Sequence, residues 1–283
     1  MENVYYGSTL ASEIREGLKE RVDKLIAQEK RIPCLAVILV GNNPASLSYV
    51  KGKEKACASV GIVSKHFHLE EDASQEEVEE LIEKCNEDAE VDGILVQLPL
   101  PNHLDETSAL LKIDPKKDVD GLHPLNVGNL YSGQPGFIPC TPLGVMELLK
   151  YMNCEIDGKK AVVIGRSNLV GAPVARLLQN ENATVTVCHS HTKDIASVCK
   201  DADILVVAMG KEKFVTRNFV KEGAYVIDVG INRTEEGKLC GDVDFDDVVD
   251  IVKGITPVPK GVGPMTICML LSNTLRAYEE REK

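Results

Sequence analysis

The stretch KKAVVIGRSNLVGAPVARLLQNENATVTVCHS, residues 159–190, decides the fold of this chain. An apolar run, KKAVVIG, leads into a turn that contains glycine and then into the helical pattern GAPVARLLQN. A second apolar run, TVTVCHS, follows. A strand, a helix and another strand in this order form a βαβ unit, whose two strands lie parallel in one sheet. We therefore expect residues 159–190 to open a parallel sheet covered by helices.

The same alternation continues towards the C-terminus. A helical pattern at 194–202 precedes the apolar run ILVVAMG at 204–210, and two further apolar runs lie at 224–231 and 254–259. Repeated strands and helices of this kind are typical of the doubly wound sheet that binds dinucleotides. A last helix is expected at 264–280, beyond that sheet, where it could pack back on the N-terminal half.

The N-terminal half shows a second set of alternating strands and helices. CLAVILV at 34–40 and VDGILVQ at 91–97 are continuous apolar runs, which suit buried parallel strands. The segment 114–142 is rich in Asp, Gly and Pro and has little periodicity, so we interpret it as the crossover between two domains. Helices are expected at 10–30, 45–60, 74–88, 103–113 and 143–152.

These patterns predict an α/β protein of two domains with a cleft between them. The N-terminal parallel-sheet α/β domain covers residues 1–139 and is completed by a C-terminal helix at 263–283. The second domain, residues 140–262, is a Rossmann-type dinucleotide-binding domain. A chain of 283 residues is long enough for two domains of this size.

Composition and charge exclude several classes of protein. Apolar residues make up 43% of the chain, but no apolar run is long enough to cross a bilayer, and the N-terminus lacks the pattern of a secretory signal. The formal net charge of −12 repels phosphate backbones. We therefore expect a cytoplasmic protein with no nucleic-acid partner and no membrane partner.

Cysteines and acidic residues do not predict a metal site. The nine cysteines are odd in number, widely spaced and without a C-x-x-C pair, so we expect reduced and mostly buried thiols. The stretch GDVDFDDVVD at 241–250 resembles a calcium-binding loop. If the loop is counted from Asp242, its sixth position is Asp247, where glycine is required, and its twelfth is Lys253.

The turn after the first strand of the C-terminal alternation is a candidate phosphate-binding site. Gly165 and Gly171 bracket it, with Arg166 and Ser167 between them. Such a turn lets a pyrophosphate approach the N-terminus of the following helix. The pattern is not G-x-G-x-x-G, so an ordinary βα turn with glycines for packing stays open as an alternative.

The end of the next strand favours NADP over NAD. An NAD site often has an Asp or Glu at this place to bind the ribose hydroxyls, but CHSHT at 188–192 has no carboxylate. Donors without a carboxylate suit a ribose phosphate. They are the hydroxyls of Ser190 and Thr192, the imidazoles of His189 and His191, and the guanidinium of Arg166.

A candidate catalytic group lies in the N-terminal half. Tyr49 and Lys53 are four residues apart and share one face of the helix expected at 45–60. Gln97 ends a predicted strand, and ligands bind beyond the carboxyl ends of parallel strands. The spacing also fits a packed tyrosine, a solvated lysine and a glutamine that caps a strand. The order of these residues, ahead of the glycine turn, differs from that of short-chain dehydrogenases.

Seven segments in order give the chain a specific resemblance. Together, and over nearly the whole chain, they resemble the bifunctional methylenetetrahydrofolate dehydrogenase/cyclohydrolase family. The segments QLPLP and GVGPMT are the most specific. The seven are YVKGKEKAC (49–57), DGILVQLPLP (92–101), DVDGLHPLNVGNL (118–130), PCTPLG (139–144), GRSNLVGAP (165–173), VIDVGIN (226–232) and GVGPMT (261–266).

The resemblance implies a reaction and roles for the N-terminal residues. The family oxidises methylenetetrahydrofolate to methenyltetrahydrofolate with a nicotinamide cofactor and then hydrolyses the product to formyltetrahydrofolate, in one-carbon metabolism and purine biosynthesis. Lys53 would be the principal catalytic residue in the hydrolysis, and Gln97 would hydrogen-bond and tune it. Tyr49 would stack on the aminobenzoyl ring, and Asp120 would hold the pterin. Burial would lower the pKa of Lys53 towards about 7–8, where it can act as a base.

The resemblance also implies ligand-binding residues in the C-terminal half and a homodimer joined through the cofactor domain. Pro259, Gly261, Gly263 and Pro264 would line the folate cleft. Gly165, Arg166, Ser167, Gly171, Ser190 and Ile231 would bind NADP, with Ile231 near the nicotinamide.

Two positions depart from the family pattern. Lys260 stands where glycine is common, and Leu143 follows PCTP where a basic residue is common. Both bear on folate affinity more than on the reaction. Two other hypotheses remain: another dehydrogenase on a similar two-domain frame, of the amino-acid or shikimate type, and a catalytically silent binding protein. The other dehydrogenase leaves Tyr49, Gln97 and GVGPMT unexplained. The intact Lys53, Gln97 and Asp120 argue against a silent binding protein.

Overall fold

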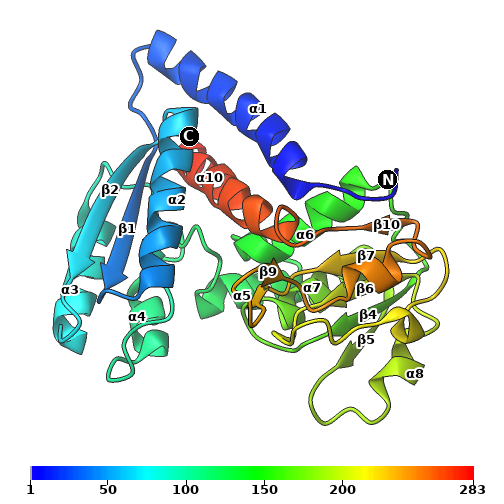
Figure 1. The fold of residues 1–283 in the computed structure, drawn as a ribbon. Helices are drawn as coiled ribbons and strands as arrows, with labels where there is room; N and C mark the ends of the chain where they lie inside the picture. Colours follow the sequence, from blue (N-terminus) through cyan, green and yellow to red (C-terminus); the bar gives the residue numbers. More distant parts are fainter. Residues whose placement is uncertain (1) are drawn as a thin grey trace. The chain divides into compact units, whose positions relative to one another are not determined.

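The computed structural model describes residues 2–283, and its contacts divide the chain into two compact units (Figure 1). One unit contains Thr141–Thr266 together with the N-terminal residues up to Ser12. The other contains Glu13–Cys140 and Ile267–Lys283. We call the first the dinucleotide unit and the second the lysine unit, after Lys53.

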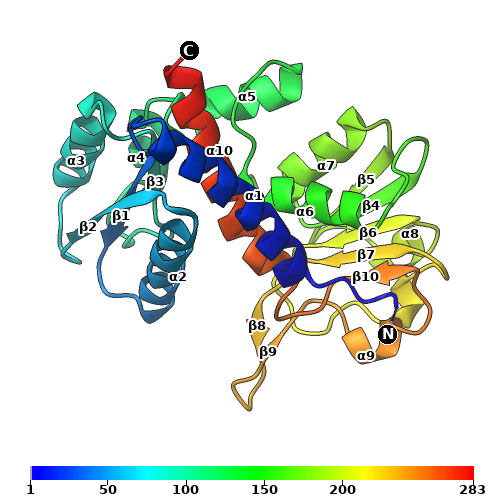
Figure 2. The same cartoon turned by 90° about the horizontal axis from the view of Figure 1, so that it is seen from above.

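The dinucleotide unit is built on a five-stranded parallel sheet in the order β10-β7-β6-β4-β5 (Figures 1 and 2). From β4, the fourth strand in this order, the chain runs outwards in both directions: β5 pairs with β4 on one side, and β6 then pairs with β4 on the other. The junction between β4 and β6 is therefore a topological switch point, where open α/β sheets bind ligands. The strands are β4 (Lys160–Ile164), β5 (Thr184–Cys188), β6 (Ile204–Val207), β7 (Tyr225–Asp228) and β10 (Gly254–Ile255).

Apolar runs form the middle of this sheet because helices and loops cover it. Every residue of β6 and β7 is buried, as expected for strands covered on both faces. The remaining elements of the unit are α6 (Cys140–Tyr151, whose first residue is counted with the lysine unit), α7 (Gly171–Asn180), α8 (Ile195–Cys199), the 3₁₀ helix η1 (Arg217–Phe219), β8 (Asn232–Arg233), β9 (Leu239–Cys240) and α9 (Phe245–Val248).

The N-terminal residues lie against the free edge of this sheet, which differs from the expected domain of residues 1–139. Val4 forms a parallel bridge with Ile255, and the backbone N–H of Tyr5 donates to the carbonyl of Ile255 at 2.9 Å. Ser8 donates in the same way to Lys260 at 3.0 Å. A two-residue edge strand leaves backbone groups unpaired, and this segment pairs with them.

The lysine unit has a three-stranded parallel sheet in the order β2-β1-β3. The central strand, β1 (Cys34–Val40), is buried along its whole length, as its continuous apolar run predicts. The other strands are β2 (Val63–Leu69) and β3 (Gly93–Val96). The helices are α2 (Pro44–Val60), α3 (Gln75–Glu87), α4 (Glu106–Lys112) and α5 (Pro124–Ser132), with most of α1 (Gly7–Ala27) and α10 (Val262–Arg281).

The sequence patterns missed two elements of this unit. β2, VSKHFHL, is an edge strand that alternates partly buried and exposed residues, and its Lys and His side chains hide the apolar alternation. α5 lies within 114–142, which we interpreted as a crossover. It has Pro124 at its start and Gly133 in the left-handed conformation just after its end, which are common signals of a short helix.

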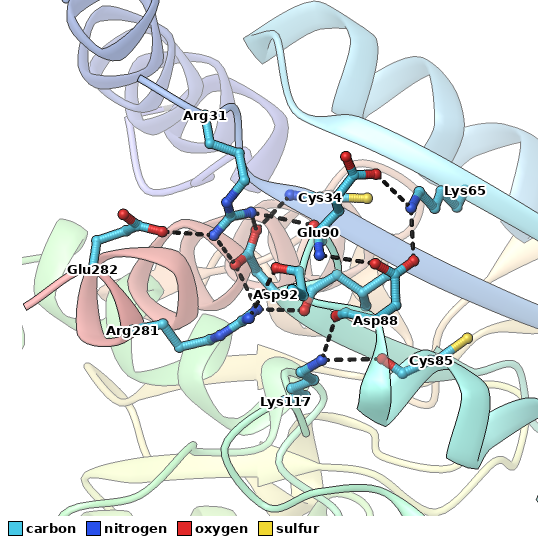
Figure 3. Close-up of polar contacts among 12 residues, drawn as sticks. Arg31, Cys34, Lys65, Cys85, Asp88, Glu90, Asp92, Lys117, Arg281 and Glu282 are labelled. Atoms are coloured by element: carbon cyan, nitrogen blue, oxygen red, sulfur yellow. Dashed lines mark hydrogen bonds and ion pairs between the residues drawn. The ribbon is translucent and has the colours of Figure 1, made fainter. Parts of the chain in front are cut away.

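The C-terminal end of α10 is fixed to the start of β3 by a buried carboxylate (Figure 3). The side chain of Asp92 is 0% exposed. It accepts two hydrogen bonds of 2.8 Å from Arg31, one of 2.9 Å from Arg281 and one of 2.9 Å from the backbone N–H of Cys34. Arg31 also lies over the ring of Tyr278. We call Asp92, Arg31 and Arg281 the carboxylate clamp.

Two further properties bear on the sequence analysis. Among residues 2–283, no helix combines the length and the apolar character needed to span a membrane. The nine cysteines are free thiols, and all but Cys154 and Cys240 are buried.

Candidate functional site

The turn after β4 brings the two expected glycines together. Gly165 has φ of +121°, and a Cβ there would lie 2.1 Å from the carbonyl oxygen of Ala208. A Cβ on Gly171 would lie 2.2 Å from the carbonyl oxygen of Gly165. Only glycine permits both approaches. The two glycines therefore do serve packing, as the alternative interpretation proposed. The same close approach of backbone segments makes the turn tight.

This tight turn leaves the N-terminus of α7 uncapped by any conventional N-cap side chain. Val170 occupies the N-cap position and makes no side-chain cap hydrogen bond. Ser167 Oγ accepts from the backbone N–H of Val170 at 3.2 Å, and its hydroxyl hydrogen can still be donated to a ligand. Arg166 and Ser167 are both exposed. A helix N-terminus beside an exposed arginine and a hydroxyl fits a phosphate group.

The segment after β5 also fits a phosphorylated ribose. Thr192 Oγ1 accepts from the backbone N–H of His189, and His189 Nδ1 accepts from that of His191, so these side chains fix the turn. Ser190 is exposed. The nearest carboxylate, Asp194, accepts a hydrogen bond from Ser197 N as the N-cap of α8. The sequence CHSHT therefore offers donors to a ligand without a competing negative charge.

Two other expected binding residues meet in the dinucleotide unit. Ile231, which follows β7, is 50% exposed although it is apolar. A Cβ on Gly263 would lie 3.9 Å from Cδ1 of Ile231. The segment that holds Pro259, Gly261 and Pro264 thus lies close to the residue expected near the nicotinamide. Lys260 in that segment has φ of +80°, the left-handed conformation that glycine adopts most readily.

The lysine unit brings Lys53 and Gln97 into direct contact. Lys53 lies on α2, and its Nζ donates a hydrogen bond of 2.8 Å to Oε1 of Gln97, the residue after β3. Gln97 in turn donates from Nε2 to the carbonyl of Leu98 at 2.6 Å. This second bond orients the amide so that its oxygen faces the lysine. The spacing also allowed a solvated Lys53. Because its amine is hydrogen-bonded to Gln97, that alternative is wrong.

The charge state of Lys53 is set by burial and by one carboxylate. Burial lowers the pKa of Lys53, and the nearby negative charge of Asp120 opposes that shift. For Asp120 the order is the same: burial raises its pKa and the Lys53 ammonium lowers it. Both groups are thus displaced towards their neutral forms. An amine that loses its proton more easily than free lysine can accept one from a substrate or from water.

Tyr49 lies one helical turn before Lys53 on α2, and 48% of it is exposed. A large exposed ring beside a buried amine offers an apolar surface on which a planar ligand can stack. A tyrosine that packs in the core, the alternative that the spacing left open, is wrong for this residue.

Asn273 and Cys140 belong to this region, and the sequence analysis did not identify either. Asn273 Nδ2 on α10 donates to the carbonyl of Val119 at 2.8 Å and to that of Ile138 at 3.2 Å. Cys140 Sγ donates to the same Val119 carbonyl at 3.3 Å. These bonds fix the backbone next to Asp120. No local pattern reveals a contact between residues 154 positions apart.

No metal cluster is found in the part of the chain that the structure describes, residues 2–283. No group of three or more His, Cys, Asp or Glu side chains there is arranged to hold a metal ion. Asp242 and Asp244, within the stretch that resembles a calcium loop, interact instead with backbone N–H groups and with Lys213.

The fold and the two groups of residues define an α/β enzyme with a dinucleotide-binding unit and a separate unit that carries a partly buried lysine. Two family models match the chain. One describes the catalytic domain of tetrahydrofolate dehydrogenase/cyclohydrolase and matches residues 5–120. The other describes the NAD(P)-binding domain of the same family and matches residues 139–282. The chain belongs to the tetrahydrofolate dehydrogenase/cyclohydrolase family.

Individual relatives agree along the whole length. The chain is 57% identical over 280 residues to the bifunctional protein FolD of Agathobacter rectalis, covering 99% of this chain and 100% of the relative. A crystal structure of the bifunctional FolD enzyme of Campylobacter jejuni superimposes with a TM-score of 0.96 at 51% identity, covering 98% and 99% of the two chains. A Trypanosoma brucei FolD structure, complexed with NADP cofactor and inhibitor, gives a TM-score of 0.95 at 42% identity, covering 99% and 98%. The expected family and fold class are confirmed.

Proposed function

We propose that this chain oxidises 5,10-methylenetetrahydrofolate to 5,10-methenyltetrahydrofolate with NADP and hydrolyses the product to 10-formyltetrahydrofolate. The observation that carries the proposal is the partly buried Lys53 amine held on Gln97, in a chain that belongs to the tetrahydrofolate dehydrogenase/cyclohydrolase family. Both steps act on the same carbon of folate, so one set of folate contacts can serve both.

Lys53 would act in the hydrolytic step by holding and moving a proton at Nζ. Water must lose a proton as its oxygen adds to the methenyl carbon, and a neutral amine within hydrogen-bond reach can accept it. The lowered pKa of Lys53 makes the neutral form available at a lower pH than in free lysine. Gln97 would keep Nζ in place through its amide oxygen. The negative charge of Asp120 would stabilise the Lys53 ammonium once the amine is protonated.

Three of the groups would hold folate. Tyr49 would stack on the aminobenzoyl ring, since its exposed face is one turn from Lys53. Asp120 would bind the pterin, for which a carboxylate is a suitable acceptor. Pro259, Gly261, Gly263 and Pro264 would line the folate cleft beside Ile231.

The cofactor residues fit NADP. Gly165 and Gly171 would allow the pyrophosphate to approach α7, Ser167 would donate to it, and Arg166 with Ser190 would bind the ribose phosphate. Ile231 would lie against the nicotinamide. When bound, the dinucleotide supplies the two-electron oxidant for the first step. The support for NADP rather than NAD is the absence of a carboxylate in CHSHT and the use of Asp194 as a helix cap.

The proposal extends to the organisation of the enzyme. The catalytic domain would comprise residues 1–139, completed by 263–283, and the NADP-binding domain residues 140–262, although the residues up to Ser12 group by their contacts with Thr141–Thr266. We expect a cytoplasmic homodimer joined through the NADP-binding domain, acting on tetrahydrofolate derivatives without a nucleic-acid or membrane partner.

A coupled assay tests the proposal. Purified protein is incubated with methylenetetrahydrofolate and either NADP or NAD, and the methenyl product is measured by absorbance after acid quenching. A second assay follows the loss of added methenyltetrahydrofolate at neutral pH. We expect both activities, with a lower KM for NADP than for NAD. Absence of methenyl product with both cofactors would sink the dehydrogenase proposal, and a preference for NAD would overturn the cofactor assignment.

A further inference from the structure

Two buried carboxylates of the dinucleotide unit have no role in the proposed chemistry. Asp228 ends β7 and Asp242 follows β9, and both are almost completely buried, with Asp242 0% exposed. Burying a carboxylate is costly unless hydrogen bonds compensate for the lost water. Each of these two carboxylates is compensated almost entirely by backbone N–H groups, and this pattern shows which segments they hold.

Asp242 collects four donors from two loops. Its Oδ2 accepts from the backbone N–H groups of Met209 at 2.7 Å and Gly210 at 3.0 Å, and its Oδ1 accepts from that of Lys211 at 2.8 Å. The fourth donor is Nδ2 of Asn232, at 2.9 Å from Oδ1. One side chain therefore fixes both the loop after β6 and the segment after β7.

Asp228 holds Asp242 in turn. Asp228 Oδ1 accepts from the N–H groups of Gly230 and Asp242, both at 3.0 Å, and its Oδ2 accepts from that of Val243 at 2.9 Å. A Cβ on Gly241 would lie 1.8 Å from Asp228 Oδ2, and one on Gly230 would lie 2.2 Å from the carboxyl carbon of Asp242. Only glycines at these two positions allow the carboxylates to approach the backbone this closely.

The segments that Asp242 fixes adjoin the expected cofactor residues. β4 and β6 flank the switch point of the sheet, and the loop after β6 packs on the glycine turn after β4: the Ala208 carbonyl is the atom that a Cβ on Gly165 would meet, at 2.1 Å. On the other side, Asn232 is the next residue after Ile231. Asp242 lies beneath both and is shielded from solvent, so it cannot itself touch a ligand that binds from solvent.

We propose that Asp242 is the positioning residue of the cofactor site, holding the loop 208–211 and the segment 230–232 in the conformation that NADP binds. The inference rests on the proposed NADP-dependent oxidation and adds to it a residue outside the ligand contacts. It predicts that loss of Asp242 weakens NADP binding while leaving the hydrolysis of methenyltetrahydrofolate intact. Lys53 and Gln97, which carry that hydrolysis, belong to the other unit.

The test is Asp242→Asn, with Asp246→Asn as the matched control on the exposed surface of α9. An asparagine offers one oxygen to four donors and turns its own NH₂ group towards them. We expect the Kd and the KM for NADP to rise at least tenfold, with kcat at saturating NADP reduced less than threefold. Hydrolysis of added methenyltetrahydrofolate should stay within twofold of wild type. Asp246→Asn should match wild type in every measurement.

Two results would overturn the inference: an unchanged Kd for NADP, or equal losses of both activities in a folded variant. If Asp242→Asn does not fold, Asn232→Ser removes one of the four donors from a partly buried position. It should then raise the KM for NADP roughly two- to tenfold with unchanged hydrolysis; no rise would equally overturn the inference. If the wild type uses NADP and the variant uses it equally well, the inference about Asp242 is refuted but the proposed function stands. A wild-type protein that does not use NADP overturns the proposed function as well.

Discussion

Nζ of Lys53 lies 2.8 Å from Oε1 of Gln97, and the two residues are 44 positions apart in the sequence. The amide is neutral, so it orients the amine without favouring its charged form as strongly as a carboxylate would. Burial can therefore lower the pKa of Lys53, opposed chiefly by the charge of Asp120. This arrangement makes the rate of hydrolysis depend on pH with a definite sign.

Replacing the neutral amide with a carboxylate should move the pH profile. In the wild type, kcat/KM for hydrolysis should rise with pH as Lys53 loses its proton, below the pH at which free lysine does so. In Gln97→Glu the new negative charge favours the ammonium form and raises the pKa of Lys53 by about one unit or more. Hydrolysis at pH 7 should then fall roughly tenfold and recover at higher pH.

Gln97→Met is the control for this profile, because it removes the hydrogen bond without adding charge. Its rising limb should not move to higher pH. A Gln97→Glu profile that coincides with that of the wild type would show that Lys53 does not set the pH dependence.

Arg166 should discriminate between the two cofactors. A charge-assisted hydrogen bond contributes about 1.5–3 kcal/mol. Arg166→Ala should therefore weaken NADP binding roughly 10- to 150-fold, while the affinity for NAD, which lacks the ribose phosphate, should barely change. Michaelis constants for both cofactors measure this, with Lys200→Ala as an exposed control in the same unit. Equal losses for NADP and NAD would assign Arg166 to the shared pyrophosphate or to the fold.

The carboxylate clamp should dominate the stability of the lysine unit. Asp92→Asn leaves Arg31 and Arg281 without the buried negative charge that both contact, and breaking a buried pair from one side costs about 3–5 kcal/mol. Glu282→Gln removes an exposed partner of the same Arg31 and should cost about 0–1 kcal/mol. Urea unfolding followed by circular dichroism compares the two. Similar losses for both variants would mean that the clamp contributes no more than a surface ion pair.

The sequence predicted the elements whose stability comes from continuous apolar patterns. The strand at 34–40 and the helix at 171–180 have the bounds that their patterns indicate, because each is packed against the core of its own unit. β2 was missed because an edge strand buries only one side, and its Lys and His side chains break the apolar run. The bridge between Val4 and Ile255 was missed because backbone pairing leaves no pattern in side chains.

The functional residues also divide into those that the sequence predicted and those that it did not. Tyr49 and Lys53 could be proposed from helical spacing, and family motifs added Gln97 and Asp120. Asp242 could not be found from the acidic stretch around it, because its partners are backbone N–H groups of a loop some 30 residues earlier. Backbone donors are the same for every residue type, so no composition or spacing predicts them.

Replacing Lys53 with alanine and following the products separately tests the central claim most directly. Lys53→Ala and the exposed control Lys51→Ala are each given methylenetetrahydrofolate and NADP, and the methenyl and formyl products are measured over time. In Lys53→Ala the methenyl product should accumulate while the enzymatic formation of 10-formyltetrahydrofolate falls by at least about 10²–10⁴-fold, the usual contribution of a general acid–base group. Lys51→Ala should make both products at the wild-type rates. Near-normal formation of 10-formyltetrahydrofolate by folded Lys53→Ala, above the rate without enzyme, would contradict the account.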